Sequence, residues 1–325
     1  QVRKTLINFA PVKSVTLGHQ DKLKVSQKAS MEIPVGTPAG DSLAVIAINR
    51  ALGVFTNLDT SEKMEYWDNV KIYKDGPNKG RIRYVQFFMF NTKEELPYAV
   101  QYLTAAEEII IYSNANHFLR SLSTGEHITK LTNLKRLTIG AYGLTELHPD
   151  FKNLKNLEYL DLSSNCFQTI PDILTPENFP NLHALELNAN QRHTIYDLSN
   201  DIRENVGGFI DEPKFPERIL KWNNLDTLRL SVNYLQGELP KMLDHEKWTA
   251  EEVHACDTLP EILIGLPKVL PETEFFAINF NRLTGELPEW LLYHPKLDLW
   301  YPYSLRVLPD SALPPRVLRR LVSKL

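Results

Sequence analysis

The chain has 325 residues, of which 43% are hydrophobic and 23% are charged, a composition that excludes disorder on a large scale. A net charge of −4 disfavours nucleic acid as the main ligand, because no basic field covers the molecule. No apolar run approaches the roughly 20 residues that a membrane-spanning helix needs. Two cysteines, Cys166 and Cys256, are too few for a disulfide framework, and two free thiols are favoured over a single bridge.

The N-terminal part does not share the pattern that follows it. Residues 1–40 are expected to form an extension, with short strands at 15–17 and 23–25 and an extended linker at 31–40. Asp41 is a good N-cap for a helix over Ser42–Leu52, and residues 41–81 are expected to cap the structure that follows. The alternative is the remainder of an upstream domain or a membrane-anchored spacer. The first residue is Gln1 rather than methionine, which indicates a mature or trimmed chain.

A repeat of the form LxxLxLxxN begins at residue 82 and defines the rest of the chain. Copies begin at residues 82, 106, 134, 157, 182, 225, 273 and 297, and all steps except two lie between 23 and 28 residues. The clearest copies are Leu157–Asn165, Leu182–Asn190 and Leu225–Asn233. Two longer steps indicate insertions at 191–222 and 242–270, which are either functional loops or longer helices on the convex side.

Each copy has a simple physical interpretation. Its fourth and sixth residues share one face of a strand and point inward, and no copy buries that face unless its neighbours stack on it. The ninth residue is a buried asparagine that must be hydrogen-bonded, so we expect a structural ladder. Its predicted members are Asn114, Asn165, Asn190, Asn233 and Asn281. A leucine or isoleucine followed by proline recurs after several copies, and proline suits the turn that leaves a strand.

The segments LQGELP at 235–240 and LTGELP at 283–288 resemble the LxGxxP continuation of plant-receptor-type leucine-rich repeats. Residues 41–87 resemble the cap of that type but lack its paired cysteines, and in this respect the chain is more similar to bacterial extracytoplasmic leucine-rich repeat proteins. The resemblance implies an α/β fold, a right-handed curved horseshoe with a parallel β-sheet on its concave face. About eight repeats would occupy residues 82–310. Residues 311–325 would cap the end, or lie on a membrane as a basic amphipathic helix.

The third, fifth and seventh residues of each copy are predicted to project outward from the concave face. Aromatic residues gather at the N-terminal end of this face, and small or polar residues fill its middle. Exposed aromatic and arginine side chains on a rigid sheet are typical of protein-binding surfaces. The predicted ligand-binding residues are Tyr84, Phe88, Tyr112, Arg136, Tyr159, Asp161, Glu186 and Arg229.

Catalytic interpretations are weak. Asp161 and Glu186 would form a carboxylate pair on an open face, and no phosphate-binding or dinucleotide-binding glycine motif is present. A possible metal cluster in the second insertion matches no standard zinc spacing; its residues are His245, His254, Cys256 and Asp257. We therefore expect a non-enzymatic, extracytoplasmic module that needs no cofactor or metal and binds a protein or peptide.

The alternatives are a carbohydrate-binding surface protein and a hydrolase or metal-dependent enzyme built on the insertions. Tyrosine and tryptophan side chains can stack on sugar rings while aspartate and asparagine bind hydroxyls. Nucleic acid is not expected as a partner, and membrane association is expected only through an anchor outside this chain.

Overall fold

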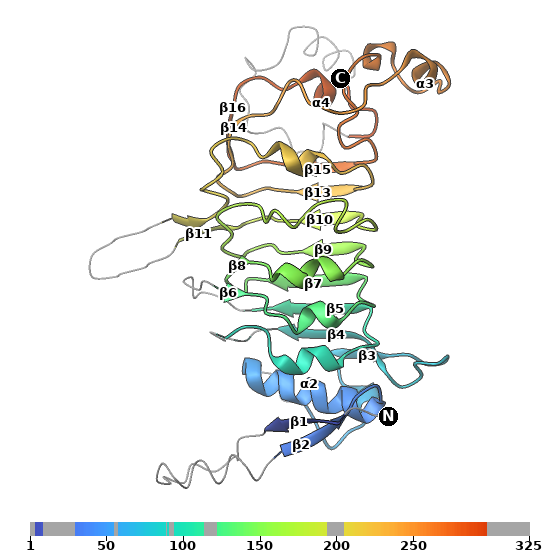
Figure 1. The fold of residues 1–325 in the computed structure, drawn as a ribbon, viewed down its shortest axis with the longest axis vertical. Helices are drawn as coiled ribbons and strands as arrows, with labels where there is room; N and C mark the ends of the chain where they lie inside the picture. The colour runs from blue at the N-terminus through green and yellow to red at the C-terminus, as the bar shows by residue number, and fades with distance from the viewer. Residues whose placement is uncertain are drawn as a thin grey trace, which may run out of the picture.

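The computed structural model describes residues 4–8, 30–54, 58–88, 90, 94–113, 122–193 and 205–297. These residues form an elongated stack of coils, with the N-terminal helix at one end and the last described coils at the other (Figure 1). Each coil contributes one strand to an eight-stranded sheet that runs the length of the stack. The solenoid that the repeats predict is therefore confirmed.

The strands of this sheet follow the predicted copies. All are parallel except β3, which pairs antiparallel with β4 at the N-terminal end. In sheet order from that end they are β3 (Val70–Ile72), β4 (Ile82–Phe88), β5 (Glu108–Tyr112), β7 (Arg136–Gly140), β9 (Tyr159–Asp161), β10 (Ala184–Glu186), β13 (Thr227–Arg229) and β15 (Phe275–Ala277). The copy predicted from residue 297 lies outside the described residues beyond Leu297 itself.

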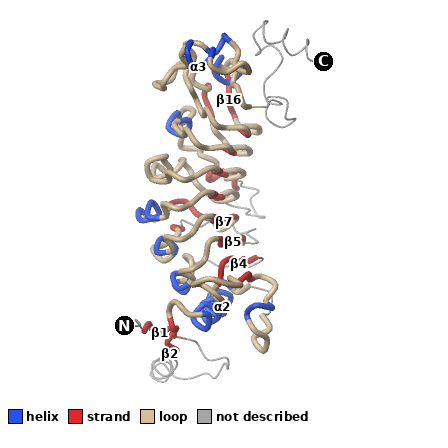
Figure 2. Tube along the Cα trace, turned by 90° about the vertical axis from the view of Figure 1, so that its right-hand side faces the viewer, coloured by secondary structure: helices blue, strands red, loops and turns tan. Residues whose placement is uncertain are grey.

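Short helical turns cover the side of the stack opposite the strands (Figure 2). Proline precedes several of them, as the sequence predicts: Pro97 and Pro288 are the residues before the first helical turn, and their φ values of −57° and −69° suit that position. The turns are η2 (Tyr98–Tyr102), η3 (Ile128–Lys130), η4 (Pro149–Asn153), η5 (Glu217–Leu220), η6 (Glu261–Leu263), α3 (Ala250–His254) and α4 (Glu289–Leu292).

The core runs between these two layers. Side chains at the fourth and sixth repeat positions, such as Leu137 and Ile139, are fully buried, and Phe151 and Phe179 stack edge to face beneath the turns. Because neighbouring coils supply both walls of this core, it is continuous along the stack.

Asparagines at the ninth repeat position join one coil to the next. The Asn165 Oδ1 atom accepts hydrogen bonds from three backbone amides of the preceding coil at 3.1–3.2 Å, and its Nδ2 atom donates to the carbonyls of Ile139 and Leu162. The amides of Asn190, Asn233 and Asn281 also donate to backbone carbonyls of the coils. Asn114 lies outside the described residues.

Smaller sheets flank the stack, and the sequence does not predict them. The two LxGxxP segments contribute β14 (Gln236–Glu238) and β16 (Arg282–Thr284), which pair in parallel. Upstream, β6 (Leu122–Ser123) pairs in parallel with β8 (Leu144–Glu146). Gly237 in the first LxGxxP segment has a φ of 84°, in the left-handed region that glycine adopts without strain.

In their described residues, neither insertion forms the longer helices that were one of the two expectations. In the first, β11 (Gln191–His193) pairs antiparallel with β12 (Asn205–Gly207), and η5 follows. The second contains only α3, of five residues, and η6, of three. Thr249 and Glu252 form a capping box at the start of α3, which accounts for a helix in so short a segment.

The expected start of the N-terminal helix is wrong. Helix α2 spans Pro38–Leu52, and Thr37 is its N-cap, accepting a hydrogen bond from the Gly40 amide at 3.0 Å. Proline is favourable at the first helical position, because an amide hydrogen there would have no acceptor within the helix and its absence costs nothing. The extended linker expected over 31–40 is also wrong at its end, since residues 38–40 are helical. Its first part is strand β2 (Ser30–Pro34), paired with β1 (Lys4–Asn8).

Asp41 has a different role from the predicted cap. Its carboxylate receives two hydrogen bonds from the Arg81 guanidinium, at 2.8 and 2.9 Å, and one from the Ile82 amide. Both side chains are buried. This ion pair ties helix α2 to the beginning of β4, so it fixes the N-terminal region against the first strand of the solenoid. The strands expected at 15–17 and 23–25 and the C-terminal segment 311–325 lie outside the described residues.

Candidate functional site

Six of the eight predicted binding residues lie in two rows on the outward face of the sheet, and Phe88 and Tyr112 lie further along their strands, at the seventh repeat position. Residues at the third repeat position pair across neighbouring strands from Tyr84 to Phe275, and those at the fifth from Gln86 to Ala277. We call these rows, with Phe88 and Tyr112 at their N-terminal end, the sheet face. Because the register is unbroken, side chains far apart in sequence become neighbours in adjacent strands.

The N-terminal end of the sheet face is aromatic and open. The rings of Phe88 and Tyr112 lie 6.4 Å apart, and Phe88 is 39% exposed. Tyr112 lies across the next strand at Gly140, where a Cβ atom would fall 2.4 Å from the tyrosine ring. Glycine at this position therefore creates the space in which the Tyr112 ring lies.

Tyr84, four residues before Phe88 on β4, is less available. Its hydroxyl donates to the Gln86 side chain at 2.5 Å, and the Lys71 ammonium lies 4.8 Å from its ring centroid. Burial, with a smaller contribution from the Glu108 carboxylate, raises the pKa of Tyr84. Its hydroxyl thus remains a hydrogen-bonding group and does not supply a negative charge.

The middle of the sheet face is a chain of paired charged and aromatic side chains. The Arg136 guanidinium lies over the Tyr159 ring, with its carbon 4.1 Å from the ring centroid, and its Nε atom is 3.3 Å from the Glu108 carboxylate. Arg229 lies in the same way on Phe275, at 4.6 Å. A guanidinium held over a ring loses little freedom when it binds an acceptor, which is a form of preorganisation.

Glu186 connects the two arginine–aromatic pairs. It accepts a hydrogen bond from the Tyr159 hydroxyl at 3.2 Å and lies 3.8 Å from Arg229. Burial, with a smaller contribution from the Asp161 carboxylate on the adjacent strand, raises the pKa of Glu186. Burial also raises the pKa of Tyr159. The contacting side chains of the sheet face from Glu108 to Phe275 are thus paired with one another, in contrast to those of the open aromatic end.

The carboxylate pair considered from the sequence does come together. Asp161 and Glu186 are direct neighbours across β9 and β10, but Asp161 accepts a hydrogen bond from the Ser163 amide at 2.8 Å. The register thus places two carboxylates side by side on the sheet face.

Groups in the second insertion have separate partners. His245 contacts the Leu220 carbonyl, His254 lies 3.8 Å from Glu261, and the Cys256 thiol hydrogen-bonds with Thr258. Within the described ranges no group of three histidine, cysteine or acidic residues could hold a metal ion. Both Cys166, which is buried, and Cys256, which is exposed, are free of disulfides.

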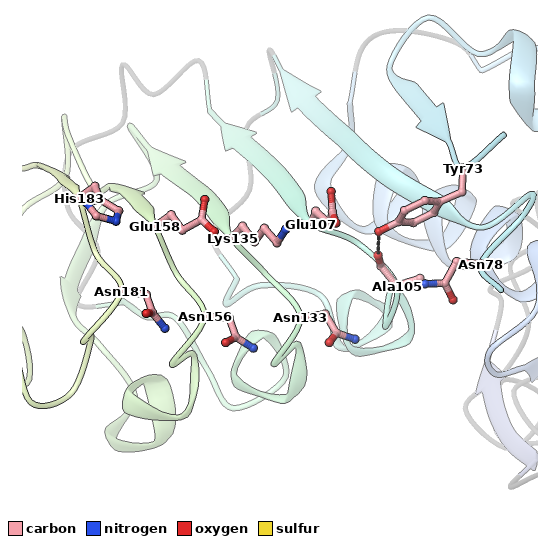
Figure 3. A pocket seen from close by; sticks show the side chains of 10 residues that line it. All are labelled: Tyr73, Asn78, Ala105, Glu107, Asn133, Lys135, Asn156, Glu158, Asn181 and His183. Carbon is pink, nitrogen blue, oxygen red and sulfur yellow. Dashed lines mark hydrogen bonds and ion pairs between the residues drawn. The ribbon is translucent and has the colours of Figure 1, made fainter. Parts of the chain in front are cut away.

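A second polar surface lies where the chain enters each strand, and the sequence interpretation missed it (Figure 3). It is a groove of about 510 Å³. Asn133, Asn156 and Asn181 each donate one hydrogen bond to the preceding coil at 2.8–2.9 Å, which fixes their amides in a row. Beside them runs a second row of mostly charged side chains: Glu107, Lys135, Glu158 and His183. An asparagine immediately before the first leucine of a copy is the signal that could have predicted this row.

The repeats also match a known family model. The model described as "Leucine rich repeat" matches residues 132–191, which include strands β7, β9 and β10. That match and the stacked parallel strands decide the fold class. The fold is a leucine-rich repeat solenoid. Within its described part, no helix is long and apolar enough to cross a membrane.

Individual relatives of this leucine-rich repeat chain are distant. "Receptor-like protein 39" of Arabidopsis thaliana is 29% identical over 264 residues, which cover 56% of this chain and 30% of the relative's length. A plant ice-binding protein is similar in structure, with a TM-score of 0.43 and 19% identity over 80% of this chain and 84% of that one. The Arabidopsis receptor kinase HAESA, solved with a peptide hormone and a co-receptor, has a TM-score of 0.40 and 16% identity over 79% of this chain and 39% of that one.

Proposed function

We propose that this leucine-rich repeat solenoid is a non-catalytic module that binds a protein or peptide partner through its sheet face. The observation that carries the proposal is a pair of arginines held over aromatic rings, Arg136 over Tyr159 and Arg229 over Phe275. Arginine and tyrosine are the side chains that most often dominate binding energy at protein interfaces. Their fixed orientation lowers the entropy that a partner must overcome on binding.

The aromatic end and the paired middle would play different parts in this recognition. Phe88 and Tyr112 offer apolar area that a partner can cover. The arginine edges offer hydrogen-bond donors to carboxylates or backbone carbonyls of the partner. We further propose that the module acts at or outside the cell surface; the receptor-like name of its Arabidopsis relative supports this location. The resemblance to bacterial extracytoplasmic leucine-rich repeat proteins in particular stays a prediction.

Affinity capture with three forms of the protein tests the proposal. The forms are the wild type, a face variant with Tyr84→Ala, Tyr112→Ala and Arg229→Ala, and a control variant with Lys152→Ala, Gln168→Ala and Lys221→Ala at exposed positions away from the sheet face. A partner captured by the wild type and the control is purified and its Kd measured. We expect the face variant to bind at least about thirtyfold more weakly, as loss of one strong contact would require. Equal affinity for the face variant would contradict the proposal.

A glycan array with the same three forms separates the alternative of carbohydrate binding. Strong glycan binding that the face variant loses would replace the protein-partner proposal with a carbohydrate one. We expect no strong glycan binding, because arginine already covers one face of the Tyr159 and Phe275 rings, which leaves Phe88 and Tyr112 as the open aromatic pair.

A further inference from the structure

A hollow of about 720 Å³ lies at the N-terminal end of the solenoid, around β3 and the turn that joins it to β4. Four cationic side chains line this hollow against a single carboxylate, that of Glu65. The cations are Lys71, Lys74, Lys79 and Arg83, and all four are exposed. A local surplus of positive charge is unusual on a chain whose net charge is −4. We call this feature the basic hollow.

Two of the four cations, Lys74 and Lys79, have neither an ion pair nor an aromatic contact among the described residues, whereas the Lys71 ammonium lies over the Tyr84 ring. Arg83 lies 3.9 Å from Glu107, and the one lining carboxylate, Glu65, lies 3.9 Å from Lys63. Among the described residues no carboxylate lies within ion-pair distance of Lys74 or Lys79, although Asp75 follows Lys74 in the turn. An anionic ligand would therefore meet cations whose charge is screened only by solvent.

The remaining lining fits an extended polypeptide. Tyr66 is 65% exposed at the rim, and apolar atoms of β3 contribute to the wall. Strand β3 is the last strand of the sheet in the described part of the chain, so the hollow lies beside a sheet edge. A sheet edge favours an extended segment, and a hollow admits such a segment more deeply than it admits the flat surface of a bilayer.

We propose that the basic hollow binds an acidic, extended segment of a protein partner, with carboxylates near Lys74 and Lys79 and an apolar side chain against Tyr66. This inference rests on the charges of the hollow and does not depend on the sheet face. It adds a second contact surface at the same end of the molecule as Phe88 and Tyr112.

Fluorescence anisotropy with a labelled peptide of alternating glutamate and leucine tests the proposal. We expect saturable binding to the wild-type protein that weakens as salt is raised, and no binding of the matched glutamine–leucine peptide. The variant Lys74→Glu/Lys79→Glu should bind roughly tenfold or more weakly, because it replaces both unpaired cations with carboxylates. The control Lys152→Glu/Lys221→Glu makes the same change in net charge elsewhere and should bind as the wild type does.

Two results would overturn the proposal. One is equal binding of the acidic peptide to the wild type and the Lys74→Glu/Lys79→Glu variant, or no binding to either. The other is binding to phosphatidylserine-containing vesicles that needs Lys74 and Lys79 while the peptide does not bind, which would assign the hollow to a membrane surface. Unchanged circular dichroism of both variants confirms that they are folded. The face variant with Tyr84→Ala, Tyr112→Ala and Arg229→Ala should still bind the peptide. Peptide binding therefore tests the basic hollow alone, and failure of the sheet-face proposal would leave it unchanged.

Discussion

The middle of the sheet face and its N-terminal end differ in how completely their side chains are paired. In the middle of the sheet face, Glu108, Arg136, Tyr159, Glu186 and Arg229 contact one another in an unbroken chain. At the N-terminal end, the Phe88 side chain is open to solvent. The named side chains of the middle already have partners within the protein, whereas the Phe88 ring leaves apolar area uncovered. Under the sheet-face proposal, the middle would orient a partner and the open end would hold it through this apolar area.

Loss of Arg81 is expected to have the largest effect on stability. The substitution Arg81→Ala leaves the buried Asp41 carboxylate without its cation, and an uncompensated buried charge costs about 3–5 kcal/mol. Urea denaturation measures the change. Arg83→Ala, two residues away and exposed, should cost no more than about 0.5 kcal/mol. Equal losses would show that the N-terminal end is not fixed by the Asp41–Arg81 pair.

Gly140→Ala is expected to disturb the open end without touching the paired middle. The new methyl group would meet the Tyr112 ring at 2.4 Å, and overpacking of this kind costs about 1–3 kcal/mol. In the double variant with Tyr112→Ala the clash is absent, so the cost of Gly140→Ala should shrink. Thermal denaturation of the four forms measures this coupling. If the two costs simply add, the ring does not lie over Gly140.

The paired middle predicts a smaller coupling between Arg136 and Tyr159. A cation over an aromatic ring at a partly exposed site contributes about 0.5–1 kcal/mol. A double-mutant cycle with Arg136→Ala and Tyr159→Ala should recover that value from urea denaturation. A coupling of zero would mean that this part of the sheet face is as unpaired as the aromatic end.

The pH dependence of stability is expected to show the smallest effect. The pKa of Glu186 is raised above 4.5 in the folded protein, so the folded state holds its proton to higher pH than the unfolded state does. Stability should therefore fall as pH rises from about 4.5 through the raised value. Glu186→Gln should reduce this fall, leaving the part that comes from Asp41, whose pKa burial also raises, and Gln86→Ala, on the same face without a titrating group, should retain the whole of it. An unchanged slope in Glu186→Gln would contradict the assignment.

Much of the architecture could be predicted from the sequence because the repeat determines the register. Once LxxLxL is assigned to a strand, the inward positions of Leu137 and Ile139 and the outward rows follow from the alternation of side chains. The placement of Asp161 beside Glu186 needed only that register. The local sequence thus sets where each residue lies in its coil, and the same placement recurs in every repeat.

Contacts between side chains could not be predicted in the same way. That Arg136 lies on Tyr159, and that Asp41 turns inward to Arg81 and does not cap a helix, depend on rotamers and on burial by coils distant in sequence. The basic hollow was not predicted, although the cluster of cations from Lys71 to Arg83 is visible in the sequence. The net charge of the whole chain does not reveal such a local cluster. The Thr37-Pro38 pair was the missed signal for the start of α2.

Site-specific photocrosslinking to the purified partner tests the sheet-face proposal most directly. A photoreactive amino acid is placed at position 112 or 229 on the sheet face, or at position 152 on the opposite side. We predict crosslinks from positions 112 and 229 and none from position 152. Crosslinks from position 152 alone would contradict binding through the sheet face.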